Sequence, residues 1–433
     1  MDLIYAGLIG ISLMLVLMLI GVPIAFSMAF VGIAGTAIFV GWNQAMTQIS
    51  LIVWDKGTDF TFVCIPLFIF MGQLTASAGI ASQLYEFLER WLGRLPGGLA
   101  IASVWACGLF GAITGSSIAC VATMGMIIYP QMKKYNYDSK LATGVLSASG
   151  TLGILIPPSI TMAFYGLLTD TSIGALFIGG IIPGIITIII FSVTILLRCI
   201  LNPKLGPVGP RHTWKEKILS MKSVLPVGSI FLIVMGSLYG GVCSPTEASG
   251  IGAAGVILVT WILKKLTWQN FCEALWHTGV TSSFIFAIMI GGFLISRFLV
   301  ITHISQLLVE YVNQMNLNQH MFILFVIVLY TILGCILDLY GSMILTLPFL
   351  FPISVNMGID PVWFGVFVTV MMEIALLTPP VGLNVFVMSG IATDVPMGTI
   401  FKGMAPFLIG EYIVLACMIY FPWTVMWLPS MMR

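Results

Sequence analysis

Charged residues are the scarcest class in this sequence. They make up 8% of the 433 residues, whereas 59% are hydrophobic, and soluble domains average roughly 25% charged residues. So few charges cannot cover a water-exposed surface of this size. Composition therefore excludes a soluble globular protein and indicates an integral membrane protein. The formal net charge of +1 also argues against nucleic-acid binding, which needs a strongly basic face.

The sequence also lacks the short motifs of redox, zinc and protease chemistry. Its eight cysteines include no CxxC pair, and cysteines within apolar stretches usually behave as small buried hydrophobic residues. The HExxH motif is absent. The first residues include Asp2 but no cluster of cations, so we expect no cleaved signal peptide.

What is present is a proline pair that occurs twice. Pro157-Pro158 and Pro379-Pro380 each lie in the middle of a long apolar stretch. Proline lacks the backbone N–H and clashes with the preceding helical turn, so each pair should break a helix. Broken helices at matching places in two halves indicate the binding site of a secondary transporter.

The proline pairs belong to a longer internal repeat. Ser82-Gln83-Leu84 recurs at 305–307, Gly115-Ser116 at 341–342, and the proline pair at 379–380, at separations of 223, 226 and 222 residues. In each half a stretch that is too long for one span and too short for two precedes the break. We interpret 97–130 and 319–357 as re-entrant hairpins of two half-helices.

Charge indicates how the two halves lie in the membrane. If Arg90 and Arg94 are cytoplasmic, a hairpin at 97–130 also keeps Lys133 and Lys134 on that side, as the positive-inside rule prefers. The far end of the second hairpin, 356–360, has no lysine or arginine and suits the outside. The two halves therefore form an inverted-topology repeat, the architecture of alternating-access carriers.

The predicted fold is an all-α polytopic membrane protein with about ten transmembrane helices, two re-entrant hairpins and both termini outside. Each half has a span, an interfacial arm (82–91 and 305–311), a hairpin, a broken helix and a further span. The predicted regions are N-terminal scaffold helices (1–60), a first repeat (61–200), a cytoplasmic basic loop (201–223), linking helices (224–279) and a second repeat (280–433). Within the first region, residues 43–60 are predicted to be a loop or interfacial segment. The broken helices are predicted at 141–168 and 362–390.

The hairpin tips and helix breaks are the candidate cation sites. Unwound backbone supplies carbonyl oxygens without burying additional charge, and helix C-terminal ends add partial negative charge. We expect each half to form one sodium cage. The predicted sodium ligands are Gly115, Ser116, Ser117, Gly153, Ile156 and Pro157 in the first half and Gly341, Ser342, Thr378 and Pro379 in the second.

The residues just past the breaks are candidates for substrate binding. Half-helix N-termini present N–H groups that attract a carboxylate, and Ser159, Thr161 and Asn384 could add hydrogen bonds. Asp338 and Glu373 are ionisable residues inside predicted spans, which favours a role in substrate or proton coupling. The alternative for both is a hydrogen-bonded structural carboxyl group.

These motifs resemble one known family, the large (M, or DctM-type) membrane subunits of tripartite ATP-independent periplasmic (TRAP) transporters. The resemblance covers essentially the whole chain. It rests on Gly115-Ser116-Ser117, Ile156-Pro157-Pro158-Ser159, Pro245-Thr246-Glu247-Ala248, Asp338 and Leu377-Thr378-Pro379-Pro380-Val381-Gly382-Leu383-Asn384.

The resemblance implies a sodium-coupled, elevator-type importer in a bacterial inner membrane. It implies two partners: a small four-helix Q subunit and a periplasmic P protein that delivers an organic acid, such as a C4-dicarboxylate, sialic acid or another sugar acid. It implies no cofactor besides the coupling ion Na⁺, and no metal site beyond it. The sequence Asp338-Leu339-Tyr340-Gly341-Ser342 departs from the family pattern at the second tip, so the second cage is less well defined.

Three other hypotheses compete with this one. A self-sufficient sodium-coupled carboxylate carrier would share the architecture. An intramembrane enzyme would use Ser116 or Ser342 as nucleophile, but no histidine lies in either broken-helix region to act as a base. A channel would not need the duplicated hairpin and break. An importer is therefore favoured over an enzyme.

Overall fold

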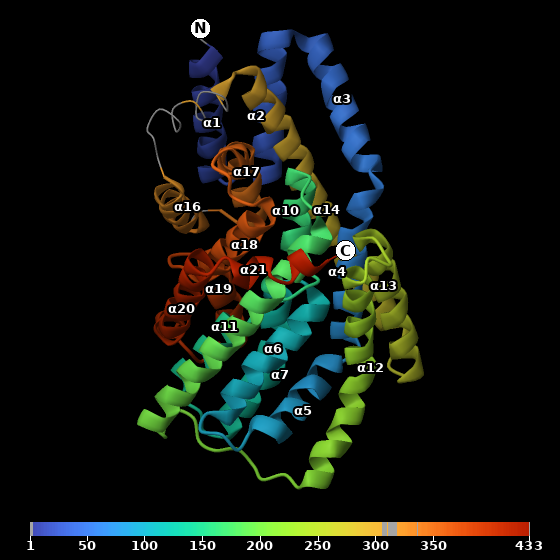
Figure 1. Ribbon diagram of the computed structural model, residues 1–433, viewed down its shortest axis with the longest axis vertical. Coiled ribbons are helices and arrows are strands. Elements are labelled where there is room, and N and C mark those ends of the chain that lie inside the picture. The colour runs from blue at the N-terminus through green and yellow to red at the C-terminus, as the bar shows by residue number, and fades with distance from the viewer. Residues whose placement is uncertain (1–2, 305–309, 311–317, 336, 433) are drawn as a thin grey trace.

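The computed structural model describes the chain except residues 1–2, 305–309, 311–317, 336 and 433 (Figure 1). Its described part is helical and has no strand. The first helices are α1 (Leu3–Leu19), α2 (Ile24–Val40), α3 (Trp42–Thr58), the 3-10 turn η1 (Phe60–Val63), α4 (Cys64–Ser77) and α5 (Ile80–Leu92). The first hairpin and its broken helix follow as α6 (Gly98–Thr114), α7 (Ser117–Lys134), α8 (Ser139–Ser149), α9 (Leu152–Leu155), α10 (Ile160–Thr169) and α11 (Ile173–Leu201).

The central and C-terminal helices complete the described chain. The central helices are α12 (Trp214–Tyr239), α13 (Pro245–Ile262) and α14 (Trp268–Ile301). The remaining ones are α16 (Gln319–Gly334), α17 (Leu339–Asn356), α18 (Pro361–Leu377), α19 (Leu383–Ile391), α20 (Met397–Tyr420), α21 (Trp423–Met426) and η2 (Pro429–Met431). The predicted second interfacial arm, 305–311, falls almost entirely outside the described residues.

Six helices of the described chain are long and apolar enough to cross a membrane, and eight if each of two bent pairs counts as one span. The bent pairs are Ser139–Leu155 with Ile160–Thr169, at 42°, and the two parts of α12 around Pro226, at 50°. This establishes a multi-pass helical membrane protein. The count of ten spans and the inverted repeat stay predictions.

Three predicted boundaries differ from the structure. Residues 42–58 form the helix α3, so the stretch predicted at 43–60 as a loop or interfacial segment is not a loop, and its place at the interface stays a prediction. The predicted loop 201–223 stops at Thr213, where α12 begins with a capping box between Thr213 and Glu216. The helix predicted to begin near 280 begins at Trp268, so α14 takes in residues that were assigned to the linking region.

The helices form two packed groups, and the hairpins belong to one of them (Figure 1). In one, the scaffold group (α1–α5 and α12–α14), α14 packs along α2 and α4, and α13 packs on α4 and α12. In the other, the hairpin group (α6–α11 and α16–α21), α20 packs along α8 and α11, and α19 packs on α7. The groups meet where α6 contacts α4 and α5, and where α17 contacts α14.

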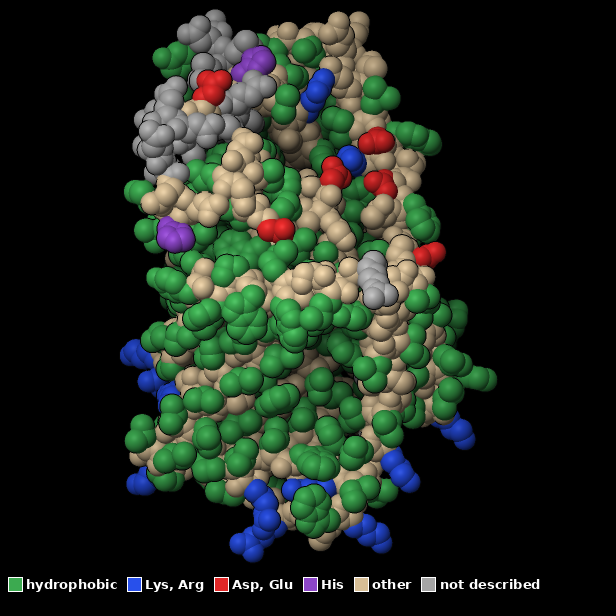
Figure 2. Space-filling view, viewed as in Figure 1, with side chains coloured by type: hydrophobic (Ala, Val, Ile, Leu, Met, Phe, Trp, Pro, Cys, Tyr) green, Lys and Arg blue, Asp and Glu red, His purple; other side chains and the backbone are tan. Residues whose placement is uncertain are grey.

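Lysine and arginine side chains gather at one end of the molecule, below a broad apolar belt (Figure 2). This is the end at which α5 and the start of α12 lie (Figure 1). Cations favour the cytoplasmic side of membrane proteins. α5 covers the predicted amphipathic stretch, and its Leu84, Tyr85 and Leu88 side chains are buried.

Candidate transport site

The tip of the first hairpin is a tight turn between α6 and α7. α6 ends at Thr114, and Gly115 adopts φ +61°, a left-handed conformation that favours glycine. Ser116 then caps α7, because its Oγ accepts a hydrogen bond from the Ala119 N–H at 3.4 Å. The sequence thus turns the chain and restarts a helix within two residues.

The first break follows from the missing N–H groups of Pro157 and Pro158. In a helix these two N–H groups would bond the carbonyl oxygens of Gly153 and Ile154, four residues earlier. The Ser159 hydroxyl donates to Ile154 O instead, and Ser159 Oγ accepts from the Met162 N–H at 3.2 Å to start α10. Ser159 does not replace the lost bond to Gly153 O.

The first tip and the first break lie against each other. The Ile160 N–H donates to Gly115 O at 3.4 Å. A Cβ added to Gly115 would lie 2.8 Å from Pro158 O, and one added to Gly153 would lie 2.8 Å from Ser116 O. The structure therefore brings together the tip and break segments that contain the predicted first cage. We call Gly115, Ser116, Ser117, Gly153, Ile156 and Pro157 the first site.

Asn384, a predicted substrate residue, joins the first site from the other half of the chain. Ser117 Oγ lies 3.0 Å from Asn384 Oδ1 and 2.7 Å from Asn384 Nδ2, which also donates to Ser147 O at 3.2 Å. Asn384 is completely buried. It thus ties α19 to the first hairpin.

The second tip and break are arranged more loosely. The Thr378 hydroxyl donates to Ile374 O at 2.6 Å within α18, and Pro379 O accepts from Cys335 Sγ at 3.1 Å. Gly341 and Ser342 lie in the first turn of α17, where a Cβ on Gly341 would lie 2.7 Å from Asp338 Oδ1 and 2.9 Å from Ile24 of α2. The described hydrogen bonds thus join the end of α16 to the second break, and none of them joins Gly341 or Ser342 to Thr378 or Pro379.

Asp338, Ser159 and Thr161 are also placed by the structure. Asp338 precedes the first turn of α17, where a helix N-terminus favours a negative charge. Ser159 and Thr161 are completely buried in the start of α10, and Thr161 lies beside the hydroxyl of Tyr340 from the second tip. Phe164 packs edge-on against Tyr340, with ring centroids 5.0 Å apart. α10 therefore supports the second tip.

A cavity of about 560 Å³ opens below the first tip, between the two helix groups. Ligand pockets usually measure about 300–1,000 Å³. Along α7 the cavity extends from Ser117 to Met126, towards the lysines that end this helix. The scaffold side includes Gln73 and His277. The cavity thus runs from the first site towards the basic end of the molecule.

The lining explains which polar residues the sequence prediction missed. The cavity is lined by Thr114, Ser116 and Ser117 of the first hairpin and by Leu339 and Tyr340 of the second. Thr114 is buried and its hydroxyl has no hydrogen-bond partner among the described residues. Thr114 adjoins the predicted tip, and Gln73 is a polar residue inside an apolar span, so both carried a signal. Ser159, Thr161 and Asn384 are not among the lining residues.

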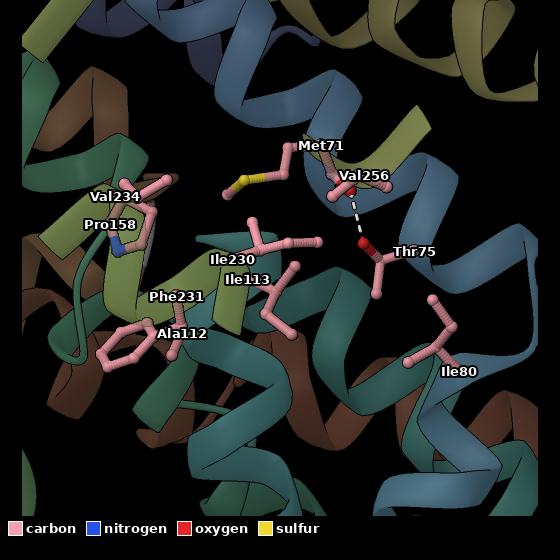
Figure 3. Close-up of a pocket in the computed structure, with 10 residues that line it drawn as sticks. All are labelled: Met71, Thr75, Ile80, Ala112, Ile113, Pro158, Ile230, Phe231, Val234 and Val256. Carbon is pink, nitrogen blue, oxygen red and sulfur yellow. Dashed lines mark hydrogen bonds between the residues drawn. The ribbon is translucent and has the colours of Figure 1, made fainter. Parts of the chain in front are cut away.

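A narrow apolar crevice lies on another part of the boundary between the groups (Figure 3). Met71 and Thr75 of α4, Ile113 of α6 and Ile230 of α12 face one another there, beside Pro158 of the first break. The Thr75 hydroxyl donates to Met71 O at 2.7 Å, so it presents no free polar group. This crevice is too small and too apolar for an organic acid.

One carboxyl group was missed altogether. Glu411, in the middle of α20, is completely buried, and its Oε1 lies 3.1 Å from Thr151 Oγ1. Its carboxyl group lies close enough to that of Glu373 on α18 to interact with it. A glutamate inside an apolar span was a sufficient signal.

Taken together, an apolar multi-pass helical body, duplicated hairpins and broken helices, and a cavity that ends at a hairpin tip define a membrane transport protein. The profile of the DctM component of the tripartite ATP-independent periplasmic transporters matches residues 11–424. The chain therefore belongs to the DctM family, and it is a transporter permease subunit and not an enzyme.

Individual relatives agree with this assignment. The chain is 32% identical over 388 residues to the C4-dicarboxylate TRAP transporter large permease protein DctM of Pseudomonas aeruginosa, covering 89% of this chain and 90% of that one. It is 31% identical over 421 residues to the sialic acid TRAP transporter large permease protein SiaM of Vibrio cholerae, covering 96% of each. The crystal structure of the Alcanivorax borkumensis YdaH transporter shares the fold, with a TM-score of 0.61 over 89% of this chain and 90% of that one at 13% identity.

Proposed function

We propose that the chain is the large membrane subunit of a sodium-coupled importer that takes a small organic acid from a periplasmic binding protein and moves it by an elevator motion. The observation that carries this proposal is the cavity of about 560 Å³ that ends at the first hairpin tip. A substrate in it would touch both the hairpin group and the scaffold group.

The chemistry of the cavity suits an anion that is held by neutral groups. Among the described residues that line it there is no lysine or arginine, and His277 is the one basic side chain. The N-termini of α7 and α17 border it through Ser117 to Ala119 and through Leu339 and Tyr340. Helix N-termini attract carboxylates through free N–H groups and the helix dipole. The Thr114 hydroxyl is available as a further donor. C4-dicarboxylates and sugar acids are of a size that such a cavity holds.

Sodium would bind at the first site as the coupling ion. The break removes the helical partner of Gly153 O, and the close approach of Gly153 to Ser116 O, 2.8 Å from an added Cβ, supports a site between the tip and the break. Carbonyl and hydroxyl oxygens suit a hard monovalent cation such as sodium. Because these ligands are neutral, the site with its bound sodium carries a net positive charge, and the membrane potential can act on that charge. At the second site, the exposed break would assemble Gly341, Ser342, Thr378 and Pro379 only after a rearrangement.

An elevator motion would carry the hairpin group past the scaffold group. Branched and aromatic side chains such as Ile113, Ile230 and Phe231 line the crevice at the boundary, and among the residues drawn there no hydrogen bond joins the two groups (Figure 3). An apolar stretch of this kind can slide. The cavity extends towards the basic end, which the positive-inside rule assigns to the cytoplasm. The described conformation would then be the inward-facing one.

Two partners follow from the tripartite family description: a small four-helix Q subunit and a periplasmic P protein. The Q subunit would cover apolar side chains that the scaffold group exposes, such as Tyr5, Leu8, Trp42 and Trp54. The complex would lie in a bacterial inner membrane.

The test is uptake by proteoliposomes that contain this chain and its small membrane partner. A labelled organic acid is supplied on the candidate binding protein, with and without an inward sodium gradient. We expect uptake only when both sodium and the binding protein are present. Uptake with sodium alone would instead establish a stand-alone carrier, and uptake without sodium would refute the coupling.

A substitution in the cavity adds a structural control. Thr114→Val keeps the shape of the side chain but removes its hydroxyl, and a lost hydrogen bond costs about 0.5–1.5 kcal/mol. We expect KM to rise roughly two- to tenfold. Thr143→Val is the matched control, because the buried Thr143 hydroxyl donates to Ser139 O inside α8 at 2.7 Å. An equal effect of both variants would argue against substrate contact at Thr114.

A further inference from the structure

Two buried glutamates meet inside the hairpin group, away from the cavity. Glu373 on α18 and Glu411 on α20 are each completely buried, on helices that pack together, and their carboxyl groups lie close enough to interact. Both oxygens of Glu373 and Oε2 of Glu411 bond no other described residue. Neither residue lines the cavity described above. The carboxyl pair, as we call these two residues, therefore has no role in holding the substrate.

Within the described part of the chain, no cation forms an ion pair with the carboxyl pair, because all the ion pairs found there involve other residues. The groups that act on the pair are the two carboxyls themselves and Thr151. The Thr151 hydroxyl lies 2.7 Å from Ala148 O and 3.1 Å from Glu411 Oε1. Tyr412, the next residue on α20, bonds the Thr331 hydroxyl at 3.3 Å instead.

This geometry requires a proton. An ionised carboxylate only accepts hydrogen bonds, so two ionised carboxylates cannot bond each other. A buried charge without a partner is strongly disfavoured. A single proton solves both problems, because the protonated carboxyl donates to its neighbour, and two close carboxyls commonly share one proton.

The position of the carboxyl pair connects it to both helix breaks. Thr151 and Glu373 each lie six residues before the first proline of their own pair, Pro157 and Pro379. The two segments that lead into the breaks thus converge on Glu411. Glu373 precedes Thr378 by five residues in sequence, which is about 7.5 Å along a helix. At that distance in a medium of low dielectric constant, a charge on the pair acts strongly on a cation at the break.

From this convergence we infer that Glu373 and Glu411 form a proton site that is coupled to cation binding. The pair holds one shared proton while the breaks are empty, and it releases that proton to water when sodium binds at the breaks. The negative charge that is left then stabilises the bound sodium. Coupling is reciprocal, so acid weakens sodium binding and sodium expels the proton. The inference rests on the sodium role proposed above.

The experiment uses the purified full chain in lipid nanodiscs. Binding of radioactive sodium is measured across neutral and mildly acidic pH, and proton release on sodium addition is followed with a pH-indicator dye. We expect sodium affinity to fall as the pH is lowered, by up to about tenfold per pH unit for one linked proton, and we expect sodium to release protons.

Three substitutions isolate the carboxyl pair. Glu411→Gln and Glu373→Gln keep the size of the side chain but cannot titrate, so each should abolish proton release and flatten the pH dependence of sodium binding. Glu247→Gln is the control, because Glu247 is an exposed carboxyl that bonds the Ser244 N–H at 2.7 Å at the start of α13. It should keep both properties.

The outcomes separate this inference from the proposed function. Sodium binding that is equal at every pH, or proton release that survives in both glutamine variants, would overturn the coupling and leave the sodium role intact. A chain that binds no sodium at any pH would overturn the sodium role and the coupling with it. If neither variant folds, the infrared carbonyl band of a protonated carboxyl decides in the wild type: the band should weaken on sodium addition, and an unchanged band would overturn the inference.

Discussion

The two proline breaks have similar sequences but different surroundings. Pro157, Pro158 and Ser159 are buried, whereas Pro379, Pro380 and Val381 are exposed. At the first break the hairpin tip rests directly on the broken segment. At the second, the tip residue Gly341 faces α2. A shared motif therefore determines where a helix breaks, but not whether a closed site forms around the break.

One methyl group distinguishes the helix contacts before the two breaks. In the first half Gly111 faces Gly153, and a Cβ on Gly111 would lie 2.6 Å from Gly153 Cα. The corresponding residues of the second half, 223 and 222 positions later, are Gly334 and Ala375, and there the Ala375 Cβ occupies the space that Gly334 faces. Small residues allow helices in membranes to approach closely, so two glycines bring the first hairpin onto its break.

The largest effect is expected for Gly153→Ala. Its new Cβ would lie 2.8 Å from Ser116 O, so the tip must move away from the break, and overpacking of this kind costs about 1–3 kcal/mol. We expect sodium affinity to fall between about fivefold and a hundredfold in a binding assay. The same substitution at Gly398, which has no neighbouring atoms within 4 Å, should change nothing. Unaltered affinity in Gly153→Ala would remove the first site from sodium binding.

An intermediate effect is expected for Asn384→Ala. This change leaves the Ser117 hydroxyl and Ser147 O without their partner across the halves, and unsatisfied buried groups cost about 1–3 kcal/mol each. The variant should unfold at a clearly lower temperature in detergent. Ser389→Ala is the control on the same helix, because the exposed Ser389 hydroxyl bonds only Phe386 O. Equal stability of the two variants would show that the buried link is unimportant.

The smallest effect on stability is expected for Asp394→Asn. Asp394 follows α19 and forms an exposed link to α7. Hydrogen bonds from Lys133 and Tyr129, at 2.7 and 3.0 Å, hold the pKa of Asp394 below its usual value. Because the pKa of this carboxyl is lower in the folded state, its ionised form stabilises the fold at any pH above the unfolded-state pKa. That stabilisation is lost as the pH falls through the folded-state pKa. Wild type should therefore be slightly more stable than the variant at neutral pH, and the difference should vanish in acid. A difference that grows in acid would contradict this sign.

Sequence reasoning succeeded where structure depends on local backbone chemistry. Pro157 and Pro379 lack an N–H wherever they stand, and Gly115 with Ser116 turns the chain by itself, so the first tip and both breaks could be predicted. The second tip was predicted too late in the chain, because Gly341 and Ser342 lie within the first turn of α17. The start of α12 at Trp214 was also within reach, since Thr213 and Glu216 have the spacing of a capping box. Lysines in the following turns favoured a loop instead.

The remaining features depend on contacts between distant segments. Glu411 meets Thr151 across 260 residues and Asn384 meets Ser117 across 267, and no local pattern marks such pairs. Asn384 was predicted to face substrate because it follows a break, but packing of α19 on α7 turns it inward. The cavity has the same origin, because Gln73 and His277 join it from the scaffold group.

The bond between Asn384 and Ser117 also has a consequence for biosynthesis. The ribosome adds about 5–20 residues per second, so the 267 residues between them take roughly 13 to 53 s to make. During that interval the first hairpin is already synthesised while the partner of Ser117 and Ser147 does not yet exist. The Ser117 hydroxyl and Ser147 O therefore lack their hydrogen-bond partner, in or near the membrane, until the last quarter of the chain is synthesised. The nascent first half therefore needs water, lipid headgroups or the insertion machinery to cover them, and it cannot mature as an independent unit.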